Sequence, residues 1–160
     1  MRRVNTTNAQ RISRPLPLAV ALAALGLFSV SPAFASERWA TLEAIHCVEN
    51  PRNVKRPGPC GELGAYQFRE ATWQAHTSQP FAAALDRQVS DAVAVKHYEA
   101  LKRGLERAGL PATSYNIALA WNGGLTAVVR GRAPAAAKNY AERVTNLAEE
   151  FNRETVASVR

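Results

Sequence analysis

The chain has 160 residues, of which 47% are hydrophobic and 21% are charged, a composition typical of one globular domain. This balance excludes a disordered chain, a collagen and a polytopic membrane protein. The formal charge of +7 would favour nucleic acid as a partner, but part of it is concentrated in four N-terminal arginines: Arg2, Arg3, Arg11 and Arg14. Without them, sixteen basic residues face thirteen acids, so we expect no nucleic acid partner.

The first 35 residues have the pattern of a signal peptide. An apolar run of about fifteen residues, Leu16 to Val30, follows the arginines and is shorter than the roughly 20 residues of a membrane span. Ala33 and Ala35 satisfy the small-x-small rule of signal peptidase, so we expect cleavage after Ala35. An uncleaved anchor is the alternative. Cleavage would leave residues 36–160 as one exported domain, periplasmic or secreted, without a stable membrane span.

The rest of the chain is predicted to be mostly α-helical, because no stretch shows the apolar–polar alternation of a half-buried strand. A first helix is expected from about Ser36 to the stop at Asn50-Pro51, and a loop rich in Gly, Pro and basic residues follows it. Further helices are expected at 69–76, 86–108, 114–122 and 134–152, with a short turn of helix at 126–130. Apolar positions at helical spacing predict a core that includes Trp39, Leu42, Ile45, Trp73, Val89, Val93, Leu101, Leu105, Ile117, Trp121, Val144, Leu147 and Phe151.

Two cysteines, Cys47 and Cys60, lie in the segment predicted to be exported. An even number of cysteines in an exported protein favours a disulfide, which would stabilise the fold by roughly 3 kcal/mol. Two free thiols are the alternative. His46 precedes Cys47, but we identify no further ligand at a helical or hairpin spacing, so no metal site is predicted. His76 and His97 are interpreted as structural or surface residues.

Glu49 is the strongest candidate for catalysis, because it stands at the predicted C-terminal end of the first helix. The negative end of the helix dipole disfavours a carboxylate there. The apolar neighbours Ile45 and Val48 also favour the protonated form. A carboxyl group that stays protonated near neutral pH can act as a general acid.

Three further motifs follow Glu49 in order: GAYQF at 64–68, AWNGG at 120–124, and Asn139-Tyr140 with Arg143-Val144. Together they resemble the lysozyme-like superfamily, and most closely its soluble lytic transglycosylase domain. In that family a catalytic Glu ends a helix, a Gly-Leu-Met-Gln-like stretch and an Ala-Tyr-Asn-Ala-Gly-like stretch follow, and a Tyr of the last helix completes the site. The resemblance covers roughly residues 38–150 and implies a lysozyme-like helical domain with a catalytic cleft.

The resemblance implies a role for each motif. Gly64 would let the backbone pass close to a sugar ring, and Gln67 would hydrogen-bond the glycan's hydroxyl and acetamido groups. Tyr66 would supply an apolar wall, and Phe68 would do so unless it packs in the core. Asn122 would contact the sugar beside the scissile bond. Tyr140 would place its hydroxyl near the Glu49 carboxyl.

The sequence departs from the family pattern at three positions. Asn50 stands where Ser usually follows the catalytic Glu, and Trp121 replaces the usual Tyr. Ala65-Tyr66 replaces Leu-Met, a form also seen in lysozyme-like domains outside the transglycosylases. These departures affect the expected reaction products more than the expected fold.

The implied function is cleavage of peptidoglycan strands between muramic acid and glucosamine, with anhydro-muramic ends and without metal or organic cofactor. Hydrolysing glycosidases normally use two carboxylates. Glu62 is the only acid in the loop between Glu49 and Gln67, and we interpret it as a solvated residue, which favours the one-carboxylate transglycosylase. The alternatives are a lysozyme-type hydrolase of peptidoglycan or a chitin-like glycan, and a glycan-binding protein without activity. The sequence identifies no protein partner.

Overall fold

A computed structural model of the protein describes residues 32–158, and helices are the only regular elements of this part. The elements are α1 (Pro32–Glu49), α2 (Glu70–Gln74), the 3-10 helix η1 (Phe81–Leu85), α3 (Arg87–Arg107), α4 (Ser114–Gly123), α5 (Leu125–Val129) and α6 (Ala135–Ser158). The mostly α class predicted from the sequence is thereby confirmed. The predicted signal peptide lies outside the described residues up to position 31, and positions 32–35 form the first turn of α1.

The helix ends follow local capping chemistry. Asp86 begins α3 by accepting a hydrogen bond from the Val89 backbone N–H at 3.1 Å, and Thr113 begins α4 by accepting one from the Asn116 N–H at 3.3 Å. Glu49 ends α1 directly before Asn50-Pro51, as expected, because the residue before a proline disfavours the helical conformation. The strongest local signals in the sequence therefore located the ends of these helices correctly.

Two helix boundaries differ from expectation by several residues, and one short element was not predicted. α6 runs to Ser158, six residues beyond 152, because residues 153–158 contain no glycine or proline to end the helix. α1 begins at Pro32 instead of near Ser36, with proline in the first-turn position it favours. The 3-10 helix η1 was not predicted, although Pro80 at its start is a local signal.

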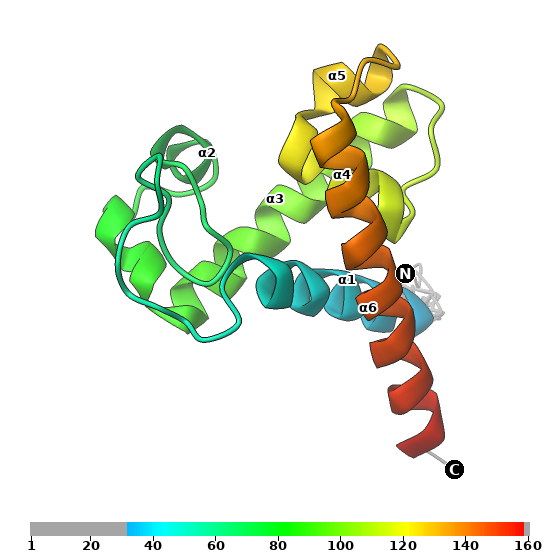
Figure 1. Ribbon diagram of the computed structural model, residues 1–160, viewed down its shortest axis with the longest axis horizontal. Helices are drawn as coiled ribbons and strands as arrows, with labels where there is room; N and C mark the ends of the chain where they lie inside the picture. Colours follow the sequence, from blue (N-terminus) through cyan, green and yellow to red (C-terminus); the bar gives the residue numbers. More distant parts are fainter. Residues whose placement is uncertain (1–31, 159–160) are drawn as a thin grey trace, which may run out of the picture.

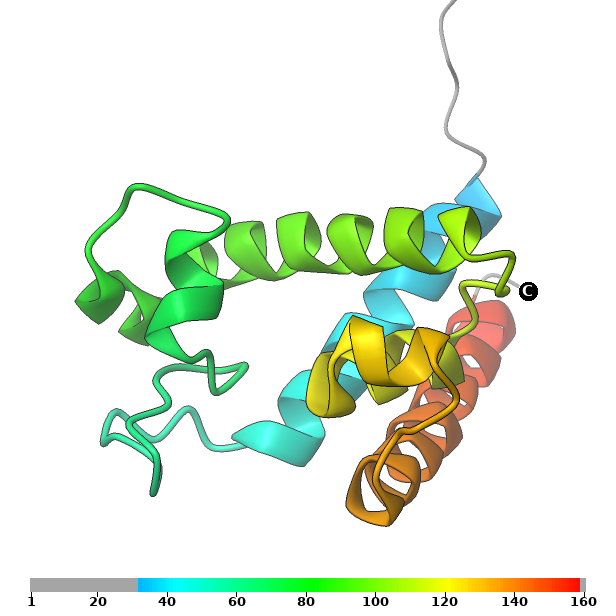
Figure 2. The ribbon, with the colours of Figure 1, turned by 90° about the horizontal axis from the view of Figure 1, so that it is seen from above.

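The largest helix–helix interfaces are those of α6, which packs against α4 and against α1. Figure 1 shows α6, in orange to red, alongside α4 and across α1. The long α3 runs from the segment 51–86, which contains loops, α2 and η1, on one side of the molecule to the α4 region on the other (Figure 2). None of the described helices is both apolar and long enough to cross a membrane.

Most of the predicted core positions are buried. The fully buried large side chains are Trp73, Ile45, Leu105, Ile117 and Val144. Trp39 is an exception, because 52% of it is exposed although its ring centroid lies 6.0 Å from that of Phe151. The prediction that Trp39 faces inward with Leu42 and Ile45 is therefore wrong.

Candidate functional site

Glu49 is half-buried at the last position of α1. Burial raises the pKa of its carboxyl above the ordinary value, and the negative charge of Glu62 raises it further. A hydrogen-bonding interaction with Tyr140 and the positive charge of Arg143 act in the opposite direction, but they do not outweigh burial. The environment therefore favours the protonated form that a general acid requires.

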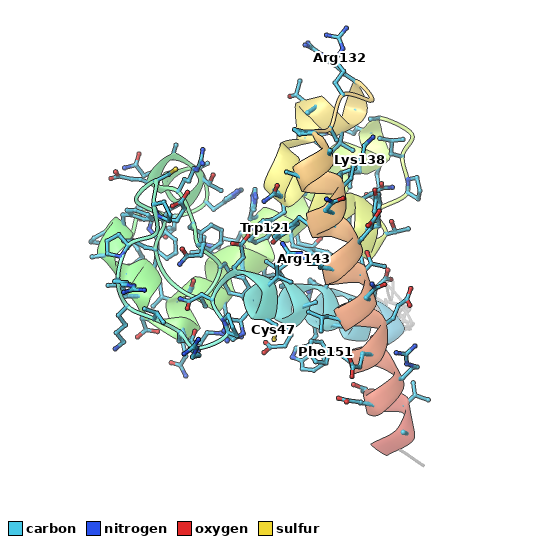
Figure 3. All side chains as sticks on the ribbon, in the orientation of Figure 1. Cys47, Trp121, Arg132, Lys138, Arg143 and Phe151 are labelled. Carbon is cyan, nitrogen blue, oxygen red and sulfur yellow. The ribbon has the colours of Figure 1, made fainter. Side chains whose placement is uncertain are left out.

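Tyr140 and Arg143 reach Glu49 from α6, about ninety residues further along the chain. Tyr140 is 4% exposed, and its pKa is raised by burial and by the nearby Glu49 carboxyl. Its hydroxyl has no partner of good hydrogen-bond geometry among the described residues, so it approaches Glu49 without completing a well-formed hydrogen bond. Figure 3 shows Arg143 on the part of α6 that crosses α1, and its guanidinium lies 6.0 Å from the centre of the Tyr140 ring.

Glu49 and Gln67 line the same open hollow, which has a volume of about 440 Å³. Its lining consists of Glu49, Asn50, Val54, Arg56, Pro57, Gly58, Pro59 and Gln67. The Gln67 backbone is left-handed, with φ of 46°, and its side-chain amide donates a hydrogen bond to the Gly64 carbonyl at 3.0 Å. This bond fixes the Gln67 side chain, so the amide oxygen is the group left to meet a ligand.

Gly64 has a different role from the one expected. Its φ is +80°, and a Cβ placed on it would overlap the Ala84 carbonyl oxygen and lie 2.7 Å from the Ala84 carbonyl carbon. Glycine is therefore required because the backbone packs against η1, and the expectation that Gly64 makes room for a sugar ring is not supported.

Tyr66 lies in the core and does not form an apolar wall of the hollow. It is 2% exposed, and its hydroxyl donates a 2.7 Å hydrogen bond to Asp91. Its ring packs against those of Phe68 and Trp121, with centroids 5.9 Å and 6.0 Å away. The prediction of substrate contact by Tyr66 is corrected accordingly, because alternation along the turn places Gln67 outward and Tyr66 and Phe68 inward.

Asn122 is exposed near the C-terminal end of α4 and does not belong to the lining of the hollow at Glu49. The preceding residue, Trp121, lies against the buried aromatic cluster, with its ring centroid 4.6 Å from that of His97. Glu49 therefore shares the hollow with Gln67 and interacts with Tyr140, whereas neither Tyr140 nor Asn122 belongs to the lining of the hollow.

Asn50 is a positioning residue that the sequence marked only as a departure from the family pattern. It is 6% exposed, and its amide nitrogen donates to the carbonyls of Val54 at 3.0 Å and Gly64 at 3.1 Å. Its amide oxygen accepts from the Val54 N–H at 2.9 Å. Serine has one hydroxyl and cannot make these three bonds at once, so Asn50 ties the loop after α1 to the turn that carries Gln67.

Glu62 is a second carboxylate within electrostatic reach of Glu49. Hydrogen bonds from its own backbone N–H and from that of Cys60 lower its pKa, and Arg69 lowers it further. The Cys60 N–H lies 2.9 Å from Oε2, and Arg69 Nε lies 3.4 Å from Oε1. Glu62 was interpreted as a solvated loop residue, and the structure adds these hydrogen-bond partners within and beside the loop. The pKa values of the Glu49 and Glu62 carboxyl groups are displaced in opposite directions.

Cys47 and Cys60 are free thiols in this structure, so the predicted disulfide is not formed. Cys47 lies about 200° around α1 from Glu49, since each residue turns a helix by about 100°. Cys60 is exposed in the loop that follows Pro59, a residue of the hollow at Glu49. Figure 3 shows Cys47 on the side of α1 toward Phe151.

Glu43 is a potential metal ligand that the sequence analysis missed, one helical turn before Cys47. The candidate ligand atoms of Glu43, His46 and Cys47 all lie within 4.8 Å of one another. The guanidinium of Arg87 already meets two of these side chains, Glu43 at 2.8 Å and His46 at 2.8 Å. A protein cation thus occupies the position that a metal ion would need.

His76 and His97 form a pair that their spacing in the sequence did not reveal. The His76 Nε2 and His97 Nδ1 atoms are 2.9 Å apart. Burial lowers the pKa of His97 to about 4, with a smaller contribution from His76. His97 is therefore neutral at physiological pH and serves as part of the aromatic packing with Phe68 and Trp121.

Comparison of the chain with protein-family models, with curated proteins and with solved structures found no match.

Proposed function

We propose that the protein is a peptidoglycan lytic transglycosylase that cleaves the bond between muramic acid and glucosamine. The observation that carries the proposal is the Glu49 carboxyl, which has a raised pKa at the end of α1 and lines an open hollow together with Gln67. The order of motifs along the chain supports the same function. Export to the compartment that contains peptidoglycan remains part of the proposal.

Glu49 would act twice in this reaction. Its proton passes to the glycosidic oxygen as the bond to the anomeric carbon breaks. The resulting carboxylate then removes the proton from the muramic acid 6-hydroxyl, whose oxygen bonds to the anomeric carbon and closes the anhydro ring. The acetamido group of the substrate stabilises the intermediate, and Glu49 ends protonated as it began. Tyr140 and Arg143 support the carboxylate form of Glu49 between the two steps, since both act to lower its pKa.

Hydrolysis is the second candidate, and Glu62 is the observation that favours it. Paired carboxyl groups with pKa values moved apart are the usual arrangement of an acid and a base in glycoside hydrolysis. The ionised Glu62 would activate a water molecule or stabilise the developing positive charge. The hydrogen bonds that Glu62 accepts from the Cys60 N–H and from Arg69 reduce its strength as a base, which is why we favour the transglycosylase.

The test is the Glu49→Gln variant, assayed for the release of soluble fragments from purified peptidoglycan. Gln keeps the size of the side chain but has no transferable proton, so we expect lysis to be lost while the circular dichroism spectrum is retained. Substantial residual lysis would show that Glu49 is not the acid.

Mass spectrometry of the unreduced fragments separates the two reactions. A transglycosylase yields anhydro-muramic ends, which are lighter by one water than the reducing ends left by a hydrolase. The intramolecular hydroxyl competes with water at an effective concentration of order 10⁵ M or more in well-oriented cases, so anhydro ends should predominate. Predominantly reducing ends, lost in Glu62→Gln, would establish the hydrolase.

A further inference from the structure

The loop after α1 carries three exposed cations that are free of ion pairs. Arg52, Lys55 and Arg56 are exposed, and no carboxylate in the described part of the chain forms a salt bridge with any of them. Arg38 and Arg87 differ from these three, since Arg38 pairs with Glu99 at 2.7 Å and Arg87 pairs with Glu43 at 2.8 Å. The three loop cations are thus available to an external anion.

The backbone that carries these cations is held in place by Asn50. The three side-chain hydrogen bonds of Asn50 to Val54 and Gly64 span the first half of the loop. Asn53 adopts a left-handed φ of 49°, and its N–H donates to the Asn50 carbonyl at 2.9 Å. Pro57 and Pro59 restrict φ in the second half. A preorganised loop loses less conformational entropy when a ligand binds.

The cations border two neighbouring hollows. Arg56 lines the hollow that contains Glu49. Lys55 lines a second hollow of about 340 Å³, and Val54 belongs to both linings. A ligand bound at Glu49 would therefore extend along a surface that carries positive charge on the same side.

The other charged groups of the second hollow have internal partners. Asp86 and Arg87 belong to its lining. Asp86 caps α3 by accepting from the Val89 N–H, and the guanidinium of Arg87 bonds to Glu43 and Asp91. Lys55 is consequently the cation of this hollow that has no carboxylate partner in residues 32–158.

We propose that Lys55 and Arg56 bind carboxylates of the substrate and so restrict the enzyme to acidic, muramic-acid-containing glycan, as opposed to a neutral chitin-like glycan. This inference rests on the proposed function. The carboxylates have two sources in such a glycan, the lactyl group of muramic acid and the peptide attached to it. Both present the same chemistry to a guanidinium and an ammonium group, and the substrates below distinguish them.

The experiment compares the wild-type protein with the double variant Lys55→Gln/Arg56→Gln. The matched control is Arg130→Gln/Arg132→Gln, which removes the same charge from exposed residues of the turn between α5 and α6. Figure 3 shows Arg132 at the tip of that turn, away from α1. Each protein is assayed on glycan strands with their peptides, on strands from which an amidase has removed the peptides, and on stripped strands whose carboxyls have been converted to methylamides.

On peptide-bearing strands we expect the KM of the loop variant to rise about tenfold with little change in kcat, as two partly exposed charge contacts of ordinary strength imply. The control should stay within about twofold of the wild type. On the methylamide strands the KM of the wild type should rise to that of the loop variant. If the lower KM of the wild type disappears when an amidase removes the peptides, the contact is with the peptide. If it persists on the stripped strands and disappears only on the methylamide strands, the contact is with the lactyl group. Equal KM values for the wild type and the loop variant on peptide-bearing strands would overturn the inference. So would a loop variant whose KM exceeds that of the wild type by the same factor on methylamide strands as on peptide-bearing strands.

A binding measurement keeps this test independent of turnover. Glu49→Gln protein, with and without the loop substitutions, is sedimented with insoluble peptidoglycan at low and high salt. We expect the loop substitutions to remove most of the salt-sensitive fraction of binding. If no glycan is cleaved by the wild type but this fraction is lost in the loop variant, the proposed reaction fails and the anion site stands. If cleavage is normal and binding is unchanged, the anion site alone is refuted.

Discussion

Replacement of Gly64 by alanine tests whether this residue serves the fold or the substrate. The resemblance assigned Gly64 to close approach of a sugar, whereas the structure packs it against η1. A Cβ at this position would overlap the Ala84 carbonyl oxygen, and the Ser90 hydroxyl lies 3.4 Å away. The atoms that would have to move belong mainly to the backbone, so the overlap cannot be relieved by rotation of a side chain.

Gly61 offers a control with the same backbone conformation. Its φ is also +80°, but a Cβ there would meet no atom within 4 Å. Gly61→Ala should therefore cost only the left-handed strain, about 1 kcal/mol. Gly64→Ala should add about 2 to 3 kcal/mol for the steric overlap, a large part of a total stability of roughly 5–15 kcal/mol. The difference between the two variants isolates the steric cost.

Thermal unfolding followed by tryptophan fluorescence measures both variants, because Trp73 is fully buried. A destabilisation of 1 kcal/mol lowers Tm by about 4 °C in a domain of this size, so we expect losses of about 4 °C for Gly61→Ala and 12 °C or more for Gly64→Ala. Equal stability losses would refute the packing role. Loss of activity in Gly64→Ala with normal stability would restore the sugar-contact role.

Three further predictions concern the site and its support. Tyr140→Phe removes an interaction that lowers the pKa of Glu49, so the alkaline limb of the pH–activity profile should move to higher pH; an acidward shift would contradict this. The folded-state pKa of His97 is about 4 against 6.5 for the free side chain, so the unfolded chain takes up the proton at a higher pH than the folded protein. The free energy of unfolding should therefore be highest above pH 6.5 and fall by about 3 kcal/mol as the pH decreases toward 4. Urea midpoints between these values measure it, and a flat profile would show that His97 stays accessible to protons. Asn50→Ala should cost about 2 kcal/mol through the lost hydrogen bonds to Val54 and Gly64, seen as a lower urea midpoint; an unchanged midpoint would show that Asn50 does not hold the loop.

Local signals in the sequence were sufficient to predict where most of the helices lie. The caps at Asp86 and Thr113 and the stop at Asn50-Pro51 depend on side chains within four residues of the helix end, and their positions were predicted correctly or within a few residues. η1 was missed although Pro80 marks its start, and the end of α6 was missed because no glycine or proline follows residue 152 to stop the helix. Trp73 was predicted to face inward from its short helix, and it is fully buried.

Tertiary packing decided the roles that the sequence assigned incorrectly. Tyr66 and Gln67 are neighbours in one motif, yet one is buried against Phe68 and the other lines the hollow at Glu49. The turn geometry determines this, through the left-handed backbone of Gln67. No periodic pattern encodes a single left-handed residue, so the motif predicted the position of the site but not the direction of each side chain.

Glu49, the proposed general acid, and the cationic loop are connected through two adjacent residues, Glu49 and Asn50. Glu49 ends α1, and Asn50 begins the loop and bonds it to Gly64. Any movement of the Gly64–Gln67 turn is therefore transmitted to the backbone beside the acid and to the loop that carries Lys55 and Arg56. Serine at position 50 could not make all three of these hydrogen bonds, because its hydroxyl has a single proton to donate whereas the Asn50 amide donates to two carbonyls. Asn50 thus links the position of Glu49, the proposed general acid, to that of the proposed anion site, and a substrate that engages both would bind a single preorganised surface.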